Sequence, residues 1–415
     1  MTLLARGVRG TRSGDVRREN LSSLLTYVHV HGPTPRSRLT SVLGLNRSTI
    51  GDLTGELVGA RLLREEPGRN NHAAASTSSG GRPSYVVTPE SERVQVLAVD
   101  VGVTHLNIAR VGLGGVVLSR RDRSYDRGVR GRRAVVRSIA KAAASLLDEV
   151  GADAAVVGVG VAVPGMVRQR DGQVRQAPNL GWQDAPVGAD LADALGLPVA
   201  IGNDADLGIL AEHVRGAAAG VDDAVYLSGH AGVGAGVFTS GRPLIGHSGY
   251  AGEVGHIVVN PAGRPCHCGS RGCWETESGE ERLFELAGRP SGGGIGSVRE
   301  IVTAAADGDR AAAQALEQVA TSLGTGVASV VNVFNPEAII MGGALGDIFA
   351  AAEPAVRAAV DAATLAPALE QLRLLQPAFG FDSSLIGAAE LAFRPMLADP
   401  LGRAPVPAAG RVRHA

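Results

Sequence analysis

Cysteine is scarce in this chain: three occur among 415 residues, all between positions 266 and 273. Three cysteines cannot build a paired disulfide framework, so we expect a protein of the reducing cytoplasm, where clustered cysteines more often bind metal. His256 adds an imidazole to Cys266, Cys268 and Cys273, which predicts a tetrahedral, structural zinc site of the Cys3His type. Three reduced, packed cysteines are the alternative, and His267 is a weaker candidate ligand.

Long apolar runs are also missing. No stretch reaches the roughly 18 apolar residues that a helix needs to cross a bilayer, and the first residues do not resemble a secretory signal. We therefore expect no membrane association.

Net charge is nearly absent, at −1, which argues against the whole molecule being a polyanion binder. The charge is unevenly distributed, however, and almost all basic residues are arginine, with Lys141 the single lysine. Residues 1–88 hold twelve arginines against six acidic residues, a net charge of +6. A basic end on an acidic body predicts that this end binds a polyanion.

Residues 15–67 have the pattern of three helices. The first has one apolar face with i, i+3, i+4, i+7 spacing: Leu21, Leu24, Leu25 and Val28. The second is expected to begin with Thr34 as N-cap and Pro35 in its first turn, and to end at Gly44. Its predicted apolar residues are Leu39, Val42 and Leu43. Asn46 then caps a third helix, whose predicted inward residues are Ile50, Leu53 and Leu57.

Two strands follow, separated by a polar stretch at 68–81 that we expect to be a mobile loop. Three helices and a hairpin predict a winged helix-turn-helix domain. From Val94 onward, buried-looking strands alternate with amphipathic helices, and the pattern occurs twice. We predict a winged-helix domain at 1–88, one α/β lobe at 89–201 completed by 384–400, a second lobe at 202–383 and a flexible tail at 401–415. Fraying is expected from Pro395.

The Gly-Glu-x-Gly-His and Cys-x-Cys-Gly-x2-Gly-Cys-x-Glu motifs of residues 252–275 resemble the signature of the ROK family of repressors, open reading frames and kinases. The resemblance extends from Val94 to about Phe393, and the winged helix resembles that of the family's regulators, including xylose-type repressors. It implies two actin-like, ribonuclease H-like lobes with a sugar cleft between them. It also implies that His256 both binds zinc and contacts sugar.

Carboxylates and amides suit a sugar because they hydrogen-bond to paired hydroxyls. The resemblance places the sugar contacts on Gly165, Asn179, Asn203, Asp204, Glu253, His256 and Glu275. From the residues alone, Asn203 and Asp204 could instead cap a helix that begins near Ala205.

A kinase is the main alternative, since the residue matching Asp204 is the general base in the family's kinases. ATP and Mg²⁺ would then lie against glycine-rich turns that include Asp100, Gly102, Thr104, Gly232, Gly234, Gly342 and Gly343. His105 stands where the kinases usually have lysine or asparagine, and Ala231 replaces a phosphate-loop threonine. The loss of the threonine hydroxyl at Ala231 argues against kinase activity.

The start of the third helix predicts base contacts through Arg47, Ser48, Thr49 and Asp52. Arg36 and Arg38, and Arg69 or Arg82 in the wing, are candidates for phosphate contacts. A dimerisation role for the helices is the alternative, which the local charge of +6 opposes.

The sequence thus predicts a sugar-responsive transcriptional regulator, most simply a repressor. It would bind operator DNA as a homodimer or a dimer of dimers, with a sugar or sugar phosphate as effector. A scaffold with neither activity is the third reading.

Overall fold

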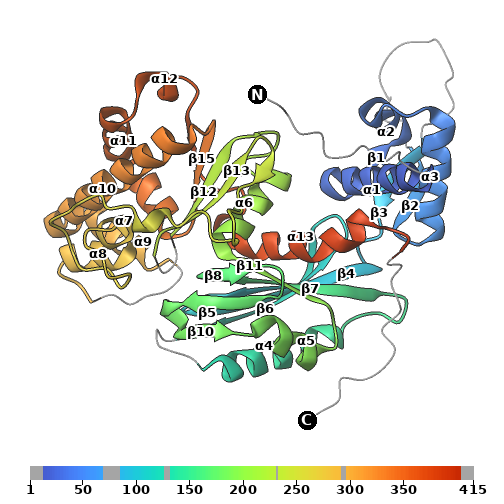
Figure 1. Cartoon of the computed structure of the whole chain (residues 1–415), viewed down its shortest axis with the longest axis horizontal. Coiled ribbons are helices and arrows are strands. Elements are labelled where there is room, and N and C mark those ends of the chain that lie inside the picture. The colour runs from blue at the N-terminus through green and yellow to red at the C-terminus, as the bar shows by residue number, and fades with distance from the viewer. Residues whose placement is uncertain (1–12, 69–84, 126–130, 230–231, 291–295, 403–415) are drawn as a thin grey trace.

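The computed structural model describes residues 13–68, 85–125, 131–229, 232–290 and 296–402. Its N-terminal part is a winged helix-turn-helix, here called the head (Figure 1). The head consists of α1 (Ser13–His31), α2 (Arg36–Leu43), α3 (Arg47–Gly59) and a small sheet of β1 (Thr34–Pro35), β3 (Tyr85–Pro89) and β2 (Leu63–Pro67), in that order. The predicted loop at 68–81 lies almost wholly outside the described residues.

Most predicted core residues of the head are buried, and two details of the second helix are wrong. α2 begins at Arg36, because Thr34 and Pro35 pair with Val87 and Val86 of the wing and so belong to a strand. Val42 is 43% exposed, so it does not belong to the apolar face. The predicted cap of α3 is confirmed: the Asn46 side chain accepts a hydrogen bond from the Thr49 amide at 2.8 Å.

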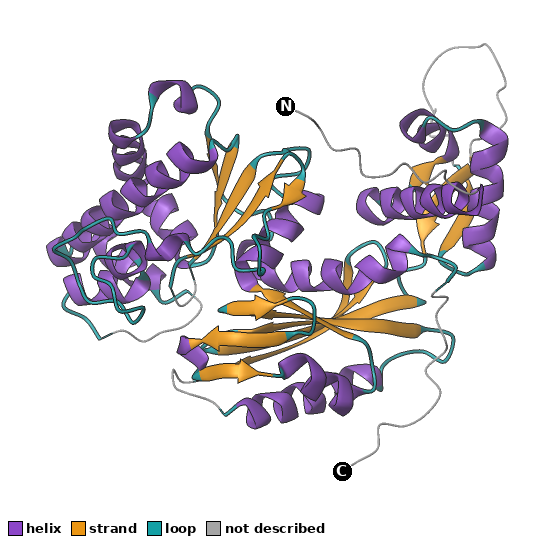
Figure 2. Ribbon diagram, in the orientation of Figure 1, coloured by secondary structure: helices purple, strands orange, loops and turns teal. Residues whose placement is uncertain are grey.

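A five-stranded sheet in the order β11-β7-β4-β5-β6 forms the first lobe. Its strands are β4 (Val94–Val101), β5 (His105–Gly112), β6 (Val116–Ser124), β7 (Ala155–Val163) and β11 (Val199–Asn203). The first three pair antiparallel, whereas β7 runs parallel to β4 and β11 parallel to β7. Every residue of β4 is buried, because α13 (Ser383–Ala398) covers one face and α4 (Arg132–Leu147) and α5 (Val187–Leu195) the other (Figure 2).

The second lobe repeats this arrangement. Its sheet has the order β14-β13-β12-β15-β16, in which three antiparallel strands are again followed by two parallel ones. The strands are β12 (Ala224–Ser228), β13 (Gly234–Thr239), β14 (Arg242–Pro243), β15 (Ala338–Met341) and β16 (Arg373–Leu375). This recurrence confirms the prediction of two similar α/β lobes.

The remaining elements complete the two lobes. A small sheet of β8 (Met166–Arg168), β9 (Gln173–Ala177) and β10 (Trp182–Ala185), with the 3-10 turn Pro178–Leu180, belongs to the first lobe. The second lobe carries α6 (Asp204–Arg215), α7 (Trp274–Ser278), α8 (Glu280–Leu286), α9 (Val298–Ala306), α10 (Arg310–Phe334), α11 (Ala344–Ala363), α12 (Ala366–Leu369) and the 3-10 turns Val254–His256 and Gly380–Asp382.

The C-terminal helix corrects the expectation of fraying from Pro395. α13 continues through Pro395 to Ala398, because Phe393, Met396 and Leu397 are buried in the core and hold the helix in place. Residues 403–415, most of the predicted tail, lie outside the described residues. Within the described part of the chain, no helix is both long and apolar enough to traverse a bilayer.

Candidate functional site

The junction of β11 and α6 organises the space between the lobes. Asn203 ends β11 and caps α6: its Oδ1 accepts hydrogen bonds from the amides of Ala205 and Asp206 at 2.8 and 3.2 Å. Its Nδ2 donates to the carbonyl oxygen of Gly165 at 2.9 Å. Asp204 is the first residue of the helix. Asn203 therefore fixes the Gly165 turn against the start of α6.

A cavity of about 100 Å³ lies beside this junction. All seven residues predicted to bind a sugar line it: Gly165, Asn179, Asn203, Asp204, Glu253, His256 and Glu275. They come from both lobes, so a ligand in the cavity would contact both. The Ser228 hydroxyl, at the end of β12, donates to Asp204 Oδ2 at 3.0 Å. This bond holds the Asp204 carboxylate in place at the cavity wall.

Two glycines give the cavity its shape. Gly165 has a positive φ of 109°, and a Cβ there would lie 2.3 Å from the carbonyl oxygen of Gln176. A Cβ on Gly232 would lie 2.5 Å from Glu275 Oε2. Gly165 therefore excludes a side chain, and Gly232 leaves the room that the Glu275 carboxylate occupies.

The cavity is lined by several carboxyl groups. Burial raises the pKa of Asp206 to about 7, and the charges of Asp204 and Glu253 act in the same direction. Burial also raises the pKa of Glu253, whereas nearby His256 lowers it. Ionised carboxylates accept hydrogen bonds and a protonated one donates, which is the mixture that a polyhydroxy compound needs.

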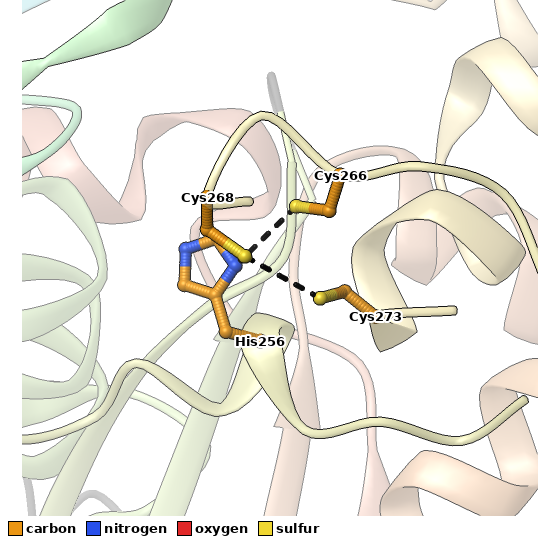
Figure 3. Close-up of side chains that lie close together, drawn as sticks. All are labelled: His256, Cys266, Cys268 and Cys273. Atoms are coloured by element: carbon orange, nitrogen blue, oxygen red, sulfur yellow. Dashed lines mark hydrogen bonds between the residues drawn. The ribbon is translucent and has the colours of Figure 1, made fainter. Parts of the chain in front are cut away.

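The four predicted metal ligands converge beside the cavity (Figure 3). His256, Cys266, Cys268 and Cys273 each offer an atom, and these atoms all lie within 4.8 Å of one another. Cys268 and Cys273 Sγ are 3.6 Å apart, and Cys266 Sγ lies 3.7 Å from His256 Nδ1. This group could hold a metal ion.

The metal group is joined to the cavity through Glu275. The Glu275 Oε1 atom lies 3.0 Å from Cys266 Sγ and 3.4 Å from His256 Nδ1. A second group of possible ligands, His256, His267 and Glu275, overlaps the first. Burial raises the pKa values of Cys266 and Cys273, whereas a backbone hydrogen bond at Ser270 lowers the pKa of Cys268.

Sequence reasoning missed Asp206, Ser228 and Tyr250, which also line the cavity. Asp206 gave a usable signal, since it shares the first turn of α6 with Asp204. Ser228 and Tyr250 gave none, because only the folding of the second lobe brings β12 and the 249–252 turn to this place.

The predicted phosphate-binding residues are distributed around two neighbouring cavities, whose linings share Pro164 and Asp204. Asp100, Gly102 and Thr104 line the smaller one, of about 30 Å³. The His105 side chain forms part of the wall of this cavity. The His105 Nε2 atom lies 2.8 Å from Asp100 Oδ2, and a Cβ on Gly102 would lie 2.0 Å from the His105 ring. Burial would lower the pKa of His105, but the charge of Asp100 and their hydrogen bond outweigh it and raise it.

Gly232 and Gly234 line the larger cavity, and Gly342 packs against Tyr226. Gly343 caps α11 and lies beside Gly229 and Ala344, which line the smaller cavity. No lysine or arginine is among the described residues that line the smaller cavity, but the carboxylates Asp100, Asp204, Glu280 and Asp347 are. Without a bound cation, these carboxylates would repel a triphosphate. His230 and Ala231, which bear on this question, lie outside the described residues.

The helix-turn-helix presents most of the predicted DNA contacts to solvent. Arg47 and Ser48 are exposed at the start of α3, where Thr49 and Asp52 follow. Arg38 is exposed on α2. In contrast, Arg36 is held in an ion pair with Glu65 of the wing. The predicted wing residues Arg69 and Arg82 lie outside the described residues.

These features define a class: a two-lobed protein with a polar cavity between its lobes, a Cys3His cluster beside that cavity and an N-terminal winged helix. The ROK family model matches residues 96–394, and the chain belongs to the ROK family.

Regulators of this family are similar over most of the chain. The xylose repressor of Bacillus subtilis is 27% identical over 334 residues, which cover 79% of this chain and 82% of that protein. The DNA-binding transcriptional dual regulator NagC of Escherichia coli is 26% identical over 391 residues, covering 92% and 94%. A solved ROK family transcriptional regulator, a homologue of the E. coli MLC protein, superposes with a TM-score of 0.75 at 29% identity and covers 94% and 99%. This superposition confirms the predicted fold class.

Proposed function

We propose that this chain is a sugar-responsive, DNA-binding transcriptional regulator that acts as a repressor of carbohydrate-use genes. The observation that carries the proposal is the combination, in one chain, of the seven-residue cavity between the lobes with the exposed start of α3 in the head. The similarity to the xylose repressor and NagC over four fifths or more of their lengths supports it.

The effector is a sugar or sugar phosphate that contacts both lobes through carboxylates and amides. We propose Gly165, Asn179, Asn203, Asp204, Glu253, His256 and Glu275 as its contacts. Asn203 keeps its caps on α6 while its neighbour Asp204 faces the ligand. Closing the lobes around a ligand changes DNA affinity only if the ligand binds the two lobe arrangements with different affinity.

The metal is zinc. In a tetrahedron with Zn–S bonds of about 2.3 Å, ligand sulfurs lie about 3.8 Å apart, close to the 3.6 Å between Cys268 and Cys273. Three thiolates and an imidazole form a closed ligand set, so the ion would be structural. When bound, it would hold the 252–275 loop and thereby orient Glu253, His256 and Glu275 in the cavity.

Operator DNA would be read by the start of α3. Arg47, Ser48 and Thr49 are the proposed base contacts, and Arg38 a phosphate contact. One recognition helix reads few base pairs, so we propose a pseudo-palindromic operator bound by a homodimer or a dimer of dimers. We also propose that the protein acts in the cytoplasm and that its domains have the predicted bounds: 1–88, 89–201 with 384–400, 202–383, and a tail at 401–415.

A sugar kinase that carries a DNA-binding domain is the second candidate, favoured by Asp204 at the start of α6. The small cavity around the Asp100–His105 pair, which is lined by carboxylates, opposes this candidate.

Two experiments test the regulator: a melting-temperature screen with D-glucose, D-xylose, N-acetyl-D-glucosamine and their phosphates, and selection of bound duplexes from a random DNA library. Sugar-dependent ATP turnover that Asp204→Asn abolishes would favour the kinase instead.

A further inference from the structure

The head is joined to the lobes by a continuous core. Residues of α1 and α3 belong to the same buried hydrophobic cluster as residues of α6 and α13. His29, on α1, is fully buried, and its ring centroid lies 5.0 Å from that of Phe393 on α13. In Figure 1, α13 runs along the first-lobe sheet toward the head. A change in the lobes can therefore reach α1 through packed atoms.

A polar cluster lies inside this junction. Arg215, the last residue of α6, donates from Nη2 to Glu390 Oε1 at 2.6 Å and from Nη1 to the carbonyl oxygen of Gly114 at 2.9 Å. His29 Nε2 lies 2.9 Å from Glu390 Oε2, and the Gly114 amide donates to His29 Nδ1 at 2.9 Å. Three separate parts of the chain, α1, α6 and α13, thus meet at one carboxylate and one guanidinium.

The contacts of His29 join the three side chains of this cluster. Its Nδ1 accepts from the Gly114 amide, and its Nε2 lies 2.9 Å from both Glu390 Oε2 and Arg215 Nη2. Burial would raise the pKa of Glu390, but His29 and Arg215 outweigh it and lower the pKa. The cluster therefore packs an imidazole against a buried carboxylate and a guanidinium, and losing either charged partner leaves the other charge unpaired in an apolar core.

The Arg215 guanidinium is not fully satisfied. Its Nε is buried and has no hydrogen-bond partner among the described residues. A buried donor without an acceptor costs free energy, so the junction is less stable than its hydrogen bonds alone would indicate.

α6 connects this cluster directly to the cavity. Its first residue, Asp204, lines the cavity, and Arg215 lies eleven residues on, about 16 Å along the helix axis. The packing leaves little slack: Ser384 Oγ donates to the Asp204 carbonyl oxygen at 3.0 Å, and a Cβ on Gly387 would lie 1.8 Å from the Leu207 carbonyl oxygen. A displacement at Asp204 therefore moves Arg215 as well.

We propose that Arg215, Glu390 and His29 are the positioning residues through which occupancy of the cavity sets the orientation of the head. This inference deepens the proposed function and rests on it. In this proposal α6 acts as a rigid element between Asp204 and Arg215 and transmits sugar binding to the head. A variant that removes the cluster should therefore bind sugar normally, but sugar binding should no longer change the head.

The test compares hydrogen exchange in the full-length protein with and without each sugar of the panel. The variant Arg215→Met/Glu390→Gln removes both charges together, so neither is left unpaired in the core. Asp382→Asn is the matched control, because it breaks the Arg120–Asp382 ion pair next to α13 without touching α1. Exchange is followed in segments 249–257 at the cavity and in 24–32 and 106–116 at the junction.

In the wild type and in Asp382→Asn, a bound sugar should slow exchange at 249–257 and change it about 5-fold or more at the two junction segments. In the double variant, the sugar should still slow exchange at 249–257, but exchange at the two junction segments should not change. Junction segments that respond equally in the double variant, or that never respond although 249–257 is protected, overturn the inference and leave the proposed function intact.

If no sugar of the panel protects 249–257, the proposed effector function fails, and a sugar-free comparison still tests the cluster. Asp204→Asn alters the start of α6 and should change exchange at 24–32 in the wild-type background only. An effect of equal size in the double variant, or no effect in either background, overturns the inference.

Discussion

Gly232 and Glu275 lie so close together that a single methyl group would disturb the cavity: a Cβ on Gly232 would be 2.5 Å from Glu275 Oε2. Gly232→Ala should therefore displace this carboxylate and lower sugar affinity about tenfold, roughly 1.4 kcal/mol. Gly234→Ala is the matched control, since its Cβ would lie 3.5 Å from the nearest atom, Ala205 Cβ. Titration of sugar by calorimetry compares the two variants, and equal affinities would show that sugar binding does not depend on the room that Gly232 leaves for Glu275.

The Cys3His cluster predicts that metal content and sugar binding are lost together. Cys268→Ser should lower zinc from about one ion per chain toward zero, reduce the melting temperature and weaken sugar binding, since the loop that carries Glu275 loses its clamp. His267→Ala should retain zinc, because His267 lies outside the proposed ligand set. Elemental analysis and thermal melts check both variants. Full sugar affinity in a metal-free Cys268→Ser protein would contradict the coupling.

The exposed start of α3 predicts a separation of DNA binding from sugar binding. Arg47→Ala should weaken binding to a selected duplex by about 1–3 kcal/mol and relax the sequence preference at one position, while sugar affinity stays unchanged. A phosphate contact at Arg38 would behave differently: Arg38→Ala should weaken binding to all sequences alike and reduce the salt dependence by about one ion. Binding isotherms at several salt concentrations distinguish the two roles, and unchanged binding by Arg47→Ala would mean that another surface reads the DNA.

Much of the fold could be predicted from local patterns. The apolar spacing of Leu21, Leu24, Leu25 and Val28 predicts a buried helix face, and all four are buried. The second helix was mispredicted at its start because Thr34 is a good cap in isolation, whereas the pairing of Thr34 with Val87 depends on a strand more than fifty residues away. Local preferences carry no information about such a partner.

In the candidate site, too, features that depend on nearby residues could be predicted, whereas features that depend on distant residues could not. His256 was predicted as a metal ligand because it lies close in sequence to the three cysteines, whereas the sugar contacts, Glu253 among them, came from the resemblance to the ROK family. The cluster of His29, Arg215 and Glu390 could not be found, since 361 residues separate His29 from Glu390 and none of the three stands in a motif. Only the packing of α1 against α13 brings them together.

The buried carboxyl of Asp206 predicts a pH-dependent stability. Its pKa is raised to about 7 in the folded chain, mainly by burial, from about 3.8. Between these values the folded state holds a proton that the unfolded state has lost, so this group's contribution to stability is most favourable below pH 4 and falls as the pH rises to 7.

Asp206→Asn keeps a neutral side chain at every pH. It should therefore raise the melting temperature at pH 8 by about 2–4 °C relative to wild type, and this gain should shrink steadily as the pH falls toward 4. Asp193→Asn, at an exposed position of α5, is the control and should give no pH-dependent difference. Thermal melts from pH 4 to 8 measure the curve. A gain for Asp206→Asn that is the same at pH 5 and pH 8 would show that Asp206 is ionised throughout, and the cavity would then hold this negative charge next to Asp204 before any ligand binds.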